Sequence, residues 1–195
     1  RAGILGEKTI CAHGVHLSER ELELLAEWRA AVVHNPQSNM NNAVGVADVP
    51  AMSRAGVLVG LGTDAMTTNM LEELRAALWV RHLAARNPSV GFAETVGLLL
   101  SGNARIASRY WQVPLGVLAP GAAADVVLVD YQPPTPLDEG TLLGHLVFGV
   151  SQSQVDTTIC RGRVLMHGKR LCLDIDEAAV AARARELAAA LWRRF

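Results

Sequence analysis

The sequence predicts an α/β fold built on a parallel sheet. The first observation is an apolar run at 57–61 without polar alternation, which is typical of a strand buried on both faces. The second is that similar short runs at 8–13 and 30–36 are separated by segments of helical periodicity. Because strands that alternate with helices through short connections form parallel sheets, the order β, α, β, α, β, α favours this architecture.

The first helix is expected directly after the first strand. Ser18 and Glu21 have the spacing of a capping box, which marks the start of a helix. Leu22, Leu25 and Trp28 then recur at helical spacing, so the helix has one apolar face.

The second strand is expected to end at Pro36, which cannot donate to a sheet, and the polar residues at 38–42 predict a loop. A short helix closed by a glycine is predicted over 48–55. After the third strand, Asn69 and Glu72 form a cap-like pair that predicts the start of a long helix.

The remaining part of the chain has a different pattern. Residues 92–110 predict helices with a break at Gly102–Asn103. A β-rich run at 123–131 and a pair of strands within 155–169 predict a small β unit. The Ala- and Arg-rich segment from 176 to 195 predicts a terminal amphipathic helix.

Composition limits the setting of the protein. The chain has 195 residues, half of them hydrophobic, and a net charge of −1, so it can bury a core and offers no basic surface for nucleic acid. No apolar run approaches the roughly 20 residues of a membrane span, and no signal peptide is evident. Cys11, Cys160 and Cys172 are odd in number and widely spaced, which predicts reduced, buried thiols in a cytoplasmic protein.

Three polar residues lie at the ends of the predicted strands. His13, His34 and Asp64 each stand at or just beyond the carboxyl end of a successive strand. In a barrel these ends converge on one mouth, where imidazoles and a carboxylate can bind a metal or transfer protons. An open doubly wound sheet is the other architecture, but neither G-x-G-x-x-G nor G-x-x-x-x-G-K-[ST] follows a strand, so the sequence offers no nucleotide-binding motif.

Structural roles are the alternatives for these three residues. Either histidine could be a hydrogen-bonded core or loop residue. Asp64 could cap the next helix, because aspartate is a favoured N-cap. Independent structural roles would not require all three residues to stand at the same end of their strands. A site shared by the three residues explains this arrangement.

Four motifs resemble the closing half of the amidohydrolase superfamily, in the branch that holds triazine hydrolases and guanine deaminases. The motifs are AHGVHLS at 12–18, HNPQSNMNN at 34–42, VGLGTD at 59–64 and GVLAPGAAADVVLVD at 116–130. Two further segments, 130–137 and 144–150, resemble more closely an aminohydrolase associated with selenium metabolism. The resemblance extends over nearly the whole chain.

This resemblance implies the closing part, strands 6–8, of a (β/α)8 metal-dependent hydrolase barrel. It also implies part of a small β-sandwich domain and a C-terminal helix. The corresponding division is a partial barrel over 1–112, a small β domain over 113–175 and the helix over 176–195. Within the β domain, a segment at about 132–152 is expected to pack on the barrel.

The resemblance also assigns roles to individual residues. Asp64 is expected to bind a divalent metal, zinc or iron, and to take a proton from the metal-bound water. His13 is expected to contact the attacking water or the substrate and to serve as a further metal ligand. The substrate-binding residues implied by the family motif are His34, Asn35, Ser38 and Asn39.

The expected function is therefore a metal-dependent hydrolase or deaminase. Its substrate would be a small heterocycle, a cyclic amidine or an aminated ring, with a non-peptide C–N bond to cleave. The family's metal site also uses a His-x-His pair after the first barrel strand and a histidine after the fifth, and neither precedes His13 in this sequence. We therefore expect that a missing N-terminal half or a partner chain completes the enzyme and that the isolated chain is inactive.

A different class of function stays open at this point. Half a barrel leaves open strand edges, which other segments must cover. The chain could be a non-catalytic fragment or a scaffold module that packs against a partner chain, and a homodimer is one further option that the resemblance suggests.

Overall fold

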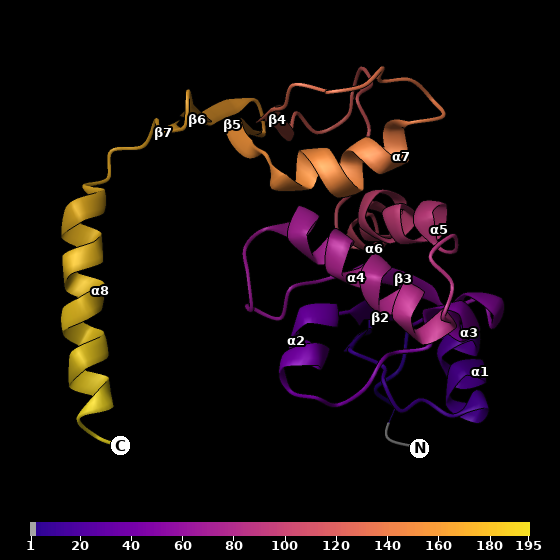
Figure 1. Cartoon of the computed structure of the whole chain (residues 1–195). Helices are drawn as coiled ribbons and strands as arrows, with labels where there is room; N and C mark the ends of the chain where they lie inside the picture. The colour runs from indigo at the N-terminus through magenta and orange to yellow at the C-terminus, as the bar shows by residue number, and fades with distance from the viewer. Residues whose placement is uncertain (1–2) are drawn as a thin grey trace.

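The computed structural model describes residues 3–195 and contains two sheets (Figure 1). The first is a three-stranded parallel sheet in the order β1-β2-β3, which confirms the prediction of an α/β fold. Its elements are β1 Ile10–Ala12, α1 Glu19–Glu27, β2 Ala31–His34, α2 Pro36–Asn41, α3 Val49–Arg54, β3 Leu58–Leu61, α4 Met70–Ala85, α5 Phe92–Gly97, η1 Leu98–Gly102 and α6 Asn103–Ala107.

Helices α1, α3 and α4 begin where the sequence predicts, because their caps are local. The hydroxyl of Ser18 accepts from the Glu21 amide and the Glu21 carboxylate accepts from the Ser18 amide, so the capping box of α1 is complete. The Asn69 side chain accepts from the first amides of α4. Asp48 caps α3 in the same manner, by accepting from the Ala51 amide.

The parallel sheet is covered on both faces at β2 and β3, whereas Ile10 and Ala12 leave one face of β1 exposed. Alternate residues of β2 point to opposite faces, so Val32 packs with α1 and α3 in one cluster while Ala31 packs with Ile106 of α6 in another. Leu61, at the end of β3, lies in a third cluster with Leu74 and Leu78 of α4. These clusters hold the carboxyl ends of the strands in fixed positions.

The segment 38–42 is largely helical, and the prediction of a loop there was wrong. Pro36 occupies the first turn of α2, a position that its fixed φ favours because an amide there has no intrahelical partner. The proline that ends β2 therefore also starts a helix. As a result, Ser38 and Asn39 are buried and oriented instead of lying on a polar loop.

The predicted break at Gly102–Asn103 was also wrong. The backbone stays helical through both residues, with a π-helical turn in η1 leading directly into α6. A Cβ atom on Gly102 would lie 2.3 Å from the Val59 carbonyl oxygen, so the glycine lets the helix approach β3 closely. Glycine favours helix ends, but here packing against the sheet overrides this local preference. That packing joins residues that are far apart in the sequence.

Gly102→Ala is expected to destabilise the protein although alanine is the better helix former. The added methyl group meets a backbone oxygen that cannot move independently, so overpacking should lower the free energy of unfolding by about 1–3 kcal/mol. Urea unfolding measures this change. Gly97→Ala is the control, because a Cβ there meets only the Ser101 hydroxyl at 3.8 Å, and equal stability of the two variants would contradict the account.

The second sheet is antiparallel, in the order β4-β5-β6-β7, and confirms the predicted strands and the hairpin. The segment before β5 packs on the parallel-sheet unit, because Val147 lies in the same core cluster as Leu61 and Leu74. The remaining elements are β4 Val126–Asp130, α7 Leu142–Gly144, η2 His145–Gly149, η3 Val150–Gln152, β5 Gln154–Cys160, β6 Arg163–His167, β7 Arg170–Leu171 and α8 Glu177–Trp192.

The terminal helix α8 is present as predicted and is capped by Asp176. It stands apart from both sheets (Figure 1), and every residue from 174 to 195 is exposed. None of the helices within residues 3–195 has both the length and the apolar character needed to cross a membrane.

Two of the three cysteines were wrongly predicted to be buried. Cys11 is half-buried on strand β1 of the parallel sheet, whereas Cys160 and Cys172 are exposed, and all three thiols are free. Both exposed thiols lie at strand ends of the antiparallel sheet, where no second layer covers them within the described part of the chain.

Candidate active site

His13 and Asp64 meet at the carboxyl end of the parallel sheet. His13 directly follows β1, and Asp64 lies three residues beyond the end of β3. The Nε2 atom of His13 is 3.6 Å from the Oδ2 atom of Asp64. Both residues have positive φ angles, 68° and 48°, a left-handed conformation that aspartate and histidine tolerate better than most residues. These sharp turns direct the two side chains toward each other across the sheet.

The short helix α2 supplies the residues that orient this pair. The Ser38 hydroxyl donates to Asp64 Oδ2 at 2.7 Å, and the Asn39 side-chain oxygen lies 2.8 Å from His13 Nδ1. Because an amide oxygen only accepts, His13 Nδ1 donates to Asn39, and in the neutral imidazole the lone pair of Nε2 is then directed to the side of Asp64. The structure thus brings together four of the residues that the sequence singled out.

The His13–Asp64 pair fits two positions of a zinc site. Zinc binds imidazole nitrogen and carboxylate oxygen at about 2.0–2.2 Å, so two ligands of one tetrahedral ion lie about 3.4 Å apart, close to the spacing observed here. A histidine whose other ring nitrogen donates to a fixed oxygen is the usual orientation of a metal ligand. Within residues 3–195 no group of three ligating side chains gathers, so further ligands would have to come from outside this part of the protein.

His34 and Asn35 do not join the hydrogen-bonded cluster. His34 belongs to the face of β2 that carries Val32, and its ring lines a separate cavity. Asn35 is buried beside Gly62, where a Cβ would lie 2.6 Å from the Asn35 side-chain oxygen. Gly62 is therefore required for the close approach of β3 and the start of α2. The substrate-binding roles of His34 and Asn35 stay predictions.

His34 should make the protein less stable in acid. Burial, and secondarily the nearby His13, lowers the pKa of His34 to about 4. Since its pKa in the unfolded chain is higher, the unfolded state binds more protons below about pH 6.5, and stability falls as the pH drops from about 6.5 to 4. The full loss would be about 3 kcal/mol.

Urea unfolding between about pH 7 and about pH 4.5 measures this dependence. His34→Leu should flatten the pH dependence, because the variant has no imidazole to protonate there. His16→Gln, at an exposed position, is the control and should keep the original slope. A His34→Leu variant with an unchanged slope would show that other groups cause the acid sensitivity.

Glu73 is a buried residue near the site that the sequence reasoning missed. Its side chain is fully buried on α4, burial raises the pKa of its carboxyl group, and the Gln37 amide donates to its Oε2 atom at 3.3 Å. The carboxyl group therefore anchors the first turn of α2, which carries Ser38. The available signal was an acidic residue beside Leu74 in the apolar stripe of the helix.

Comparison with known proteins identifies the family. The sequence model of the family described as "Amidohydrolase family" matches residues 1–165 of the chain. The chain is 35% identical to a 5-methylthioadenosine/S-adenosylhomocysteine deaminase of Pelotomaculum thermopropionicum, over 99% of this chain and 45% of the relative. It is 38% identical to the deaminase of the same description from Haloarcula marismortui, over 98% of this chain and 44% of that protein.

Solved structures agree with this family. An adenosine deaminase from Xanthomonas campestris with bound zinc superposes with a TM-score of 0.77 at 29% identity, over 94% of this chain and 42% of that one. The zinc complex of atrazine chlorohydrolase TrzN from Arthrobacter aurescens also gives a TM-score of 0.77, but at 23% identity it shows the fold alone.

The parallel-sheet unit thus carries an acid and an imidazole together at its carboxyl end, and the comparisons place the whole chain in one family. The chain belongs to the amidohydrolase family. It spans about 45% of the length of the curated relatives that it matches. The narrower resemblance to a selenium-associated aminohydrolase stays a prediction.

Proposed function

We propose that the protein is a metal-dependent aminohydrolase that removes an amino group from an aminated heterocycle. The observation that carries this proposal is the cluster of His13, Asp64, Ser38 and Asn39 at one end of the parallel sheet. The named deaminase relatives support a purine nucleoside with an exocyclic amine as the substrate class. In this proposal β1, β2 and β3 are the last three strands of an eight-stranded barrel.

Asp64 is the proton carrier in the proposed reaction. Zinc or iron, bound by Asp64, His13 and ligands from outside this chain, would lower the pKa of a water molecule toward about 7. Asp64 would accept a proton from the attacking water, whose oxygen bonds to the ring carbon that carries the amine, and would deliver this proton to the amine as the C–N bond breaks and ammonia leaves. The Ser38 hydroxyl holds the carboxylate in one orientation during both transfers, and Asn39 keeps the Nε2 lone pair of His13 directed at the site.

Ammonia release by the full-length protein that contains this chain tests the proposal. The protein should release ammonia from 5-methylthioadenosine or adenosine, lose this activity after removal of its metal by a chelator, and regain it with added zinc. Simple ring amides without an exocyclic amine should not react.

The same preparation separates the enzyme from a scaffold module. Bound zinc or iron in stoichiometric amount together with ammonia release supports the hydrolase. A protein that carries no such metal and releases no ammonia from any aminated heterocycle would instead be a non-catalytic packing module.

A further inference from the structure

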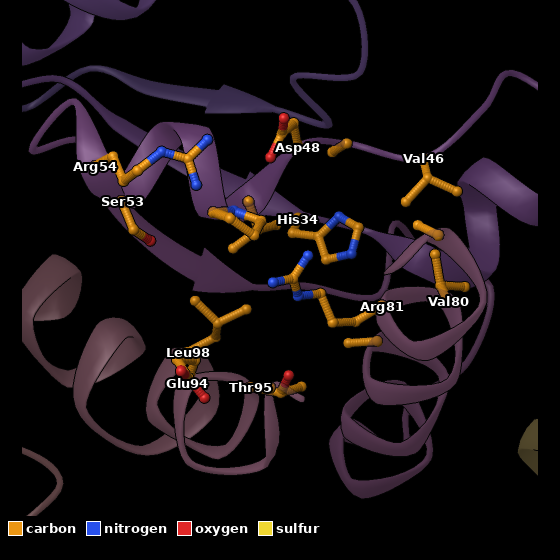
Figure 2. A pocket seen from close by; sticks show the side chains of 16 residues that line it. His34, Val46, Asp48, Ser53, Arg54, Val80, Arg81, Glu94, Thr95 and Leu98 are labelled. Atoms are coloured by element: carbon orange, nitrogen blue, oxygen red, sulfur yellow. The ribbon is translucent and has the colours of Figure 1, made fainter. Parts of the chain in front are cut away.

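A cavity of about 570 Å³ lies between α3, α4 and α5 (Figure 2). This volume is within the range of about 300–1,000 Å³ that is usual for small-molecule sites. The cavity is lined mainly by apolar side chains, among them Val46, Val49, Val80 and Leu98. It is therefore a site for a ligand with an apolar body.

The cavity is separate from the candidate active site. Its wall includes none of the four residues of the hydrogen-bonded cluster, and His34 is the one predicted site residue that lines it. His34 shares its face of β2 with Val32, which packs against α1 and α3. The cavity thus lies among the helices that cover the sheet, and its wall comes close to the candidate active site at His34, whose pKa the nearby His13 helps to lower.

Two polar groups inside the cavity have no partner within residues 3–195. His34 is 3% exposed, and its buried Nδ1 atom makes no hydrogen bond in this part of the chain. The half-buried Arg81 forms none of the ion pairs found among these residues, and its side chain lines the cavity, as that of His34 does (Figure 2). A buried polar atom and a cation without partners are costly unless a ligand or water satisfies them.

The other charged side chains on the wall lie at its rim. Arg54 and Glu94 are exposed, and the carboxylate of the exposed Asp48 is occupied by capping α3. Water screens charges at such positions. Among the arginine and carboxylate side chains on this wall, Arg81 is the one that is not exposed, so its positive charge is the least screened by water.

We propose that this cavity binds a small molecule with an apolar body and one carboxylate group. The guanidinium fork of Arg81 matches the two oxygens of a carboxylate, and the His34 imidazole provides a neighbouring polar contact. Val49, Val80 and Leu98 pack against the apolar body. This binding site uses none of the four residues to which the proposed reaction assigns metal binding, proton transfer or orientation.

Binding of 2-naphthoate to the full-length protein, followed by isothermal titration calorimetry, tests this proposal. 2-Naphthoate should bind saturably, and the neutral 2-naphthylmethanol of nearly equal shape should bind at least about tenfold more weakly, because it forms no charge-assisted pair with Arg81. Arg81→Gln should reduce naphthoate affinity by a similar factor. The imidazole resonances of His34 should shift on binding, whereas those of the exposed His16 should not.

Two control variants make the result specific. Arg75→Gln, on the same helix but with its guanidinium over the Trp79 ring, should bind 2-naphthoate as the parent protein does. Asp64→Asn should also retain binding, which excludes the candidate active site as the place of binding. Absence of saturable binding, equal affinity for the acid and the alcohol, or unchanged affinity of Arg81→Gln would each overturn the proposal. The comparison of the two ligands on the parent protein remains decisive if Arg81→Gln does not fold.

Discussion

Asp64→Asn is expected to reduce turnover of the full-length protein by about 10²–10⁴-fold while leaving its fold intact. Asparagine cannot accept and return the proton of a water molecule, and its amide is a poor metal ligand. Asparagine does tolerate the left-handed backbone found at this position, where φ is 48°. The side chain is half-exposed, so the loss of its charge-assisted bond from Ser38 should cost about 1 kcal/mol or less.

Ammonia release and urea unfolding, measured on the same preparation, distinguish a loss of turnover from a loss of stability in Asp64→Asn. The exposed Asp174→Asn is the matched control and should retain full activity. Asp64→Asn with normal turnover would remove the carboxylate from the proposed mechanism. A variant that loses activity only because it unfolds would show that Asp64 serves the structure.

The largest expected effect on stability is at Asn103. Its side-chain oxygen accepts from the Leu61 amide at 2.8 Å, and its side-chain nitrogen donates to the Leu61 carbonyl at 2.9 Å. The Asn103 side chain thus provides a partner for both backbone polar groups of Leu61, a buried residue on β3. Asn103→Leu leaves two buried polar groups without partners, at about 1–3 kcal/mol each, so the free energy of unfolding should fall by about 2–5 kcal/mol.

Urea unfolding of Asn103→Leu measures this loss. Ser101→Ala, which removes an exposed hydroxyl two residues away, should change stability by less than about 0.5 kcal/mol. If Asn103→Leu were as stable as this control, the side chain would not stabilise the edge of β3.

The strands and caps were predictable because their causes are local. An apolar run between turn residues defines β2 and β3, and the hydroxyl of Ser18 stands three residues before its carboxylate partner Glu21 in the sequence. Each signal lies within a short window. The same applies to the hairpin, whose turn at Arg161–Gly162 needs only residues of positive φ.

The features that were missed depend on contacts between distant segments. The helix through Gly102 persists because its backbone packs against Val59, more than forty positions earlier in the printed sequence. The burial of Glu73 depends on Gln37, which lies on a different helix. The partners in each pair, Gly102 with Val59 and Glu73 with Gln37, are far apart in the sequence. Local preferences therefore predicted a helix break at Gly102 that is not there and gave no indication that Glu73 is buried.

The sequence predicted which residues form the candidate site, but it did not predict the contacts that hold their side chains in place. His13 and Asp64 follow from the rule that polar residues at the carboxyl ends of parallel strands converge, and Ser38 and Asn39 followed from the family motif. The sequence placed the last two on a loop, whereas a helix fixes them in contact with the acid and the imidazole. Because side chains alternate along β2, His34 shares the face of Val32 and lines the cavity instead of joining the cluster, which its position at a strand end did not reveal.

The most direct test of the central claim is the position of the metal in crystals of the full-length protein grown with zinc. Anomalous scattering at the zinc edge should show one ion within about 2.0–2.2 Å of Asp64 Oδ2, with His13 Nε2 at a similar distance or directed at the ion's water. Zinc bound elsewhere, with both side chains outside its coordination and beyond reach of its water, would contradict the account.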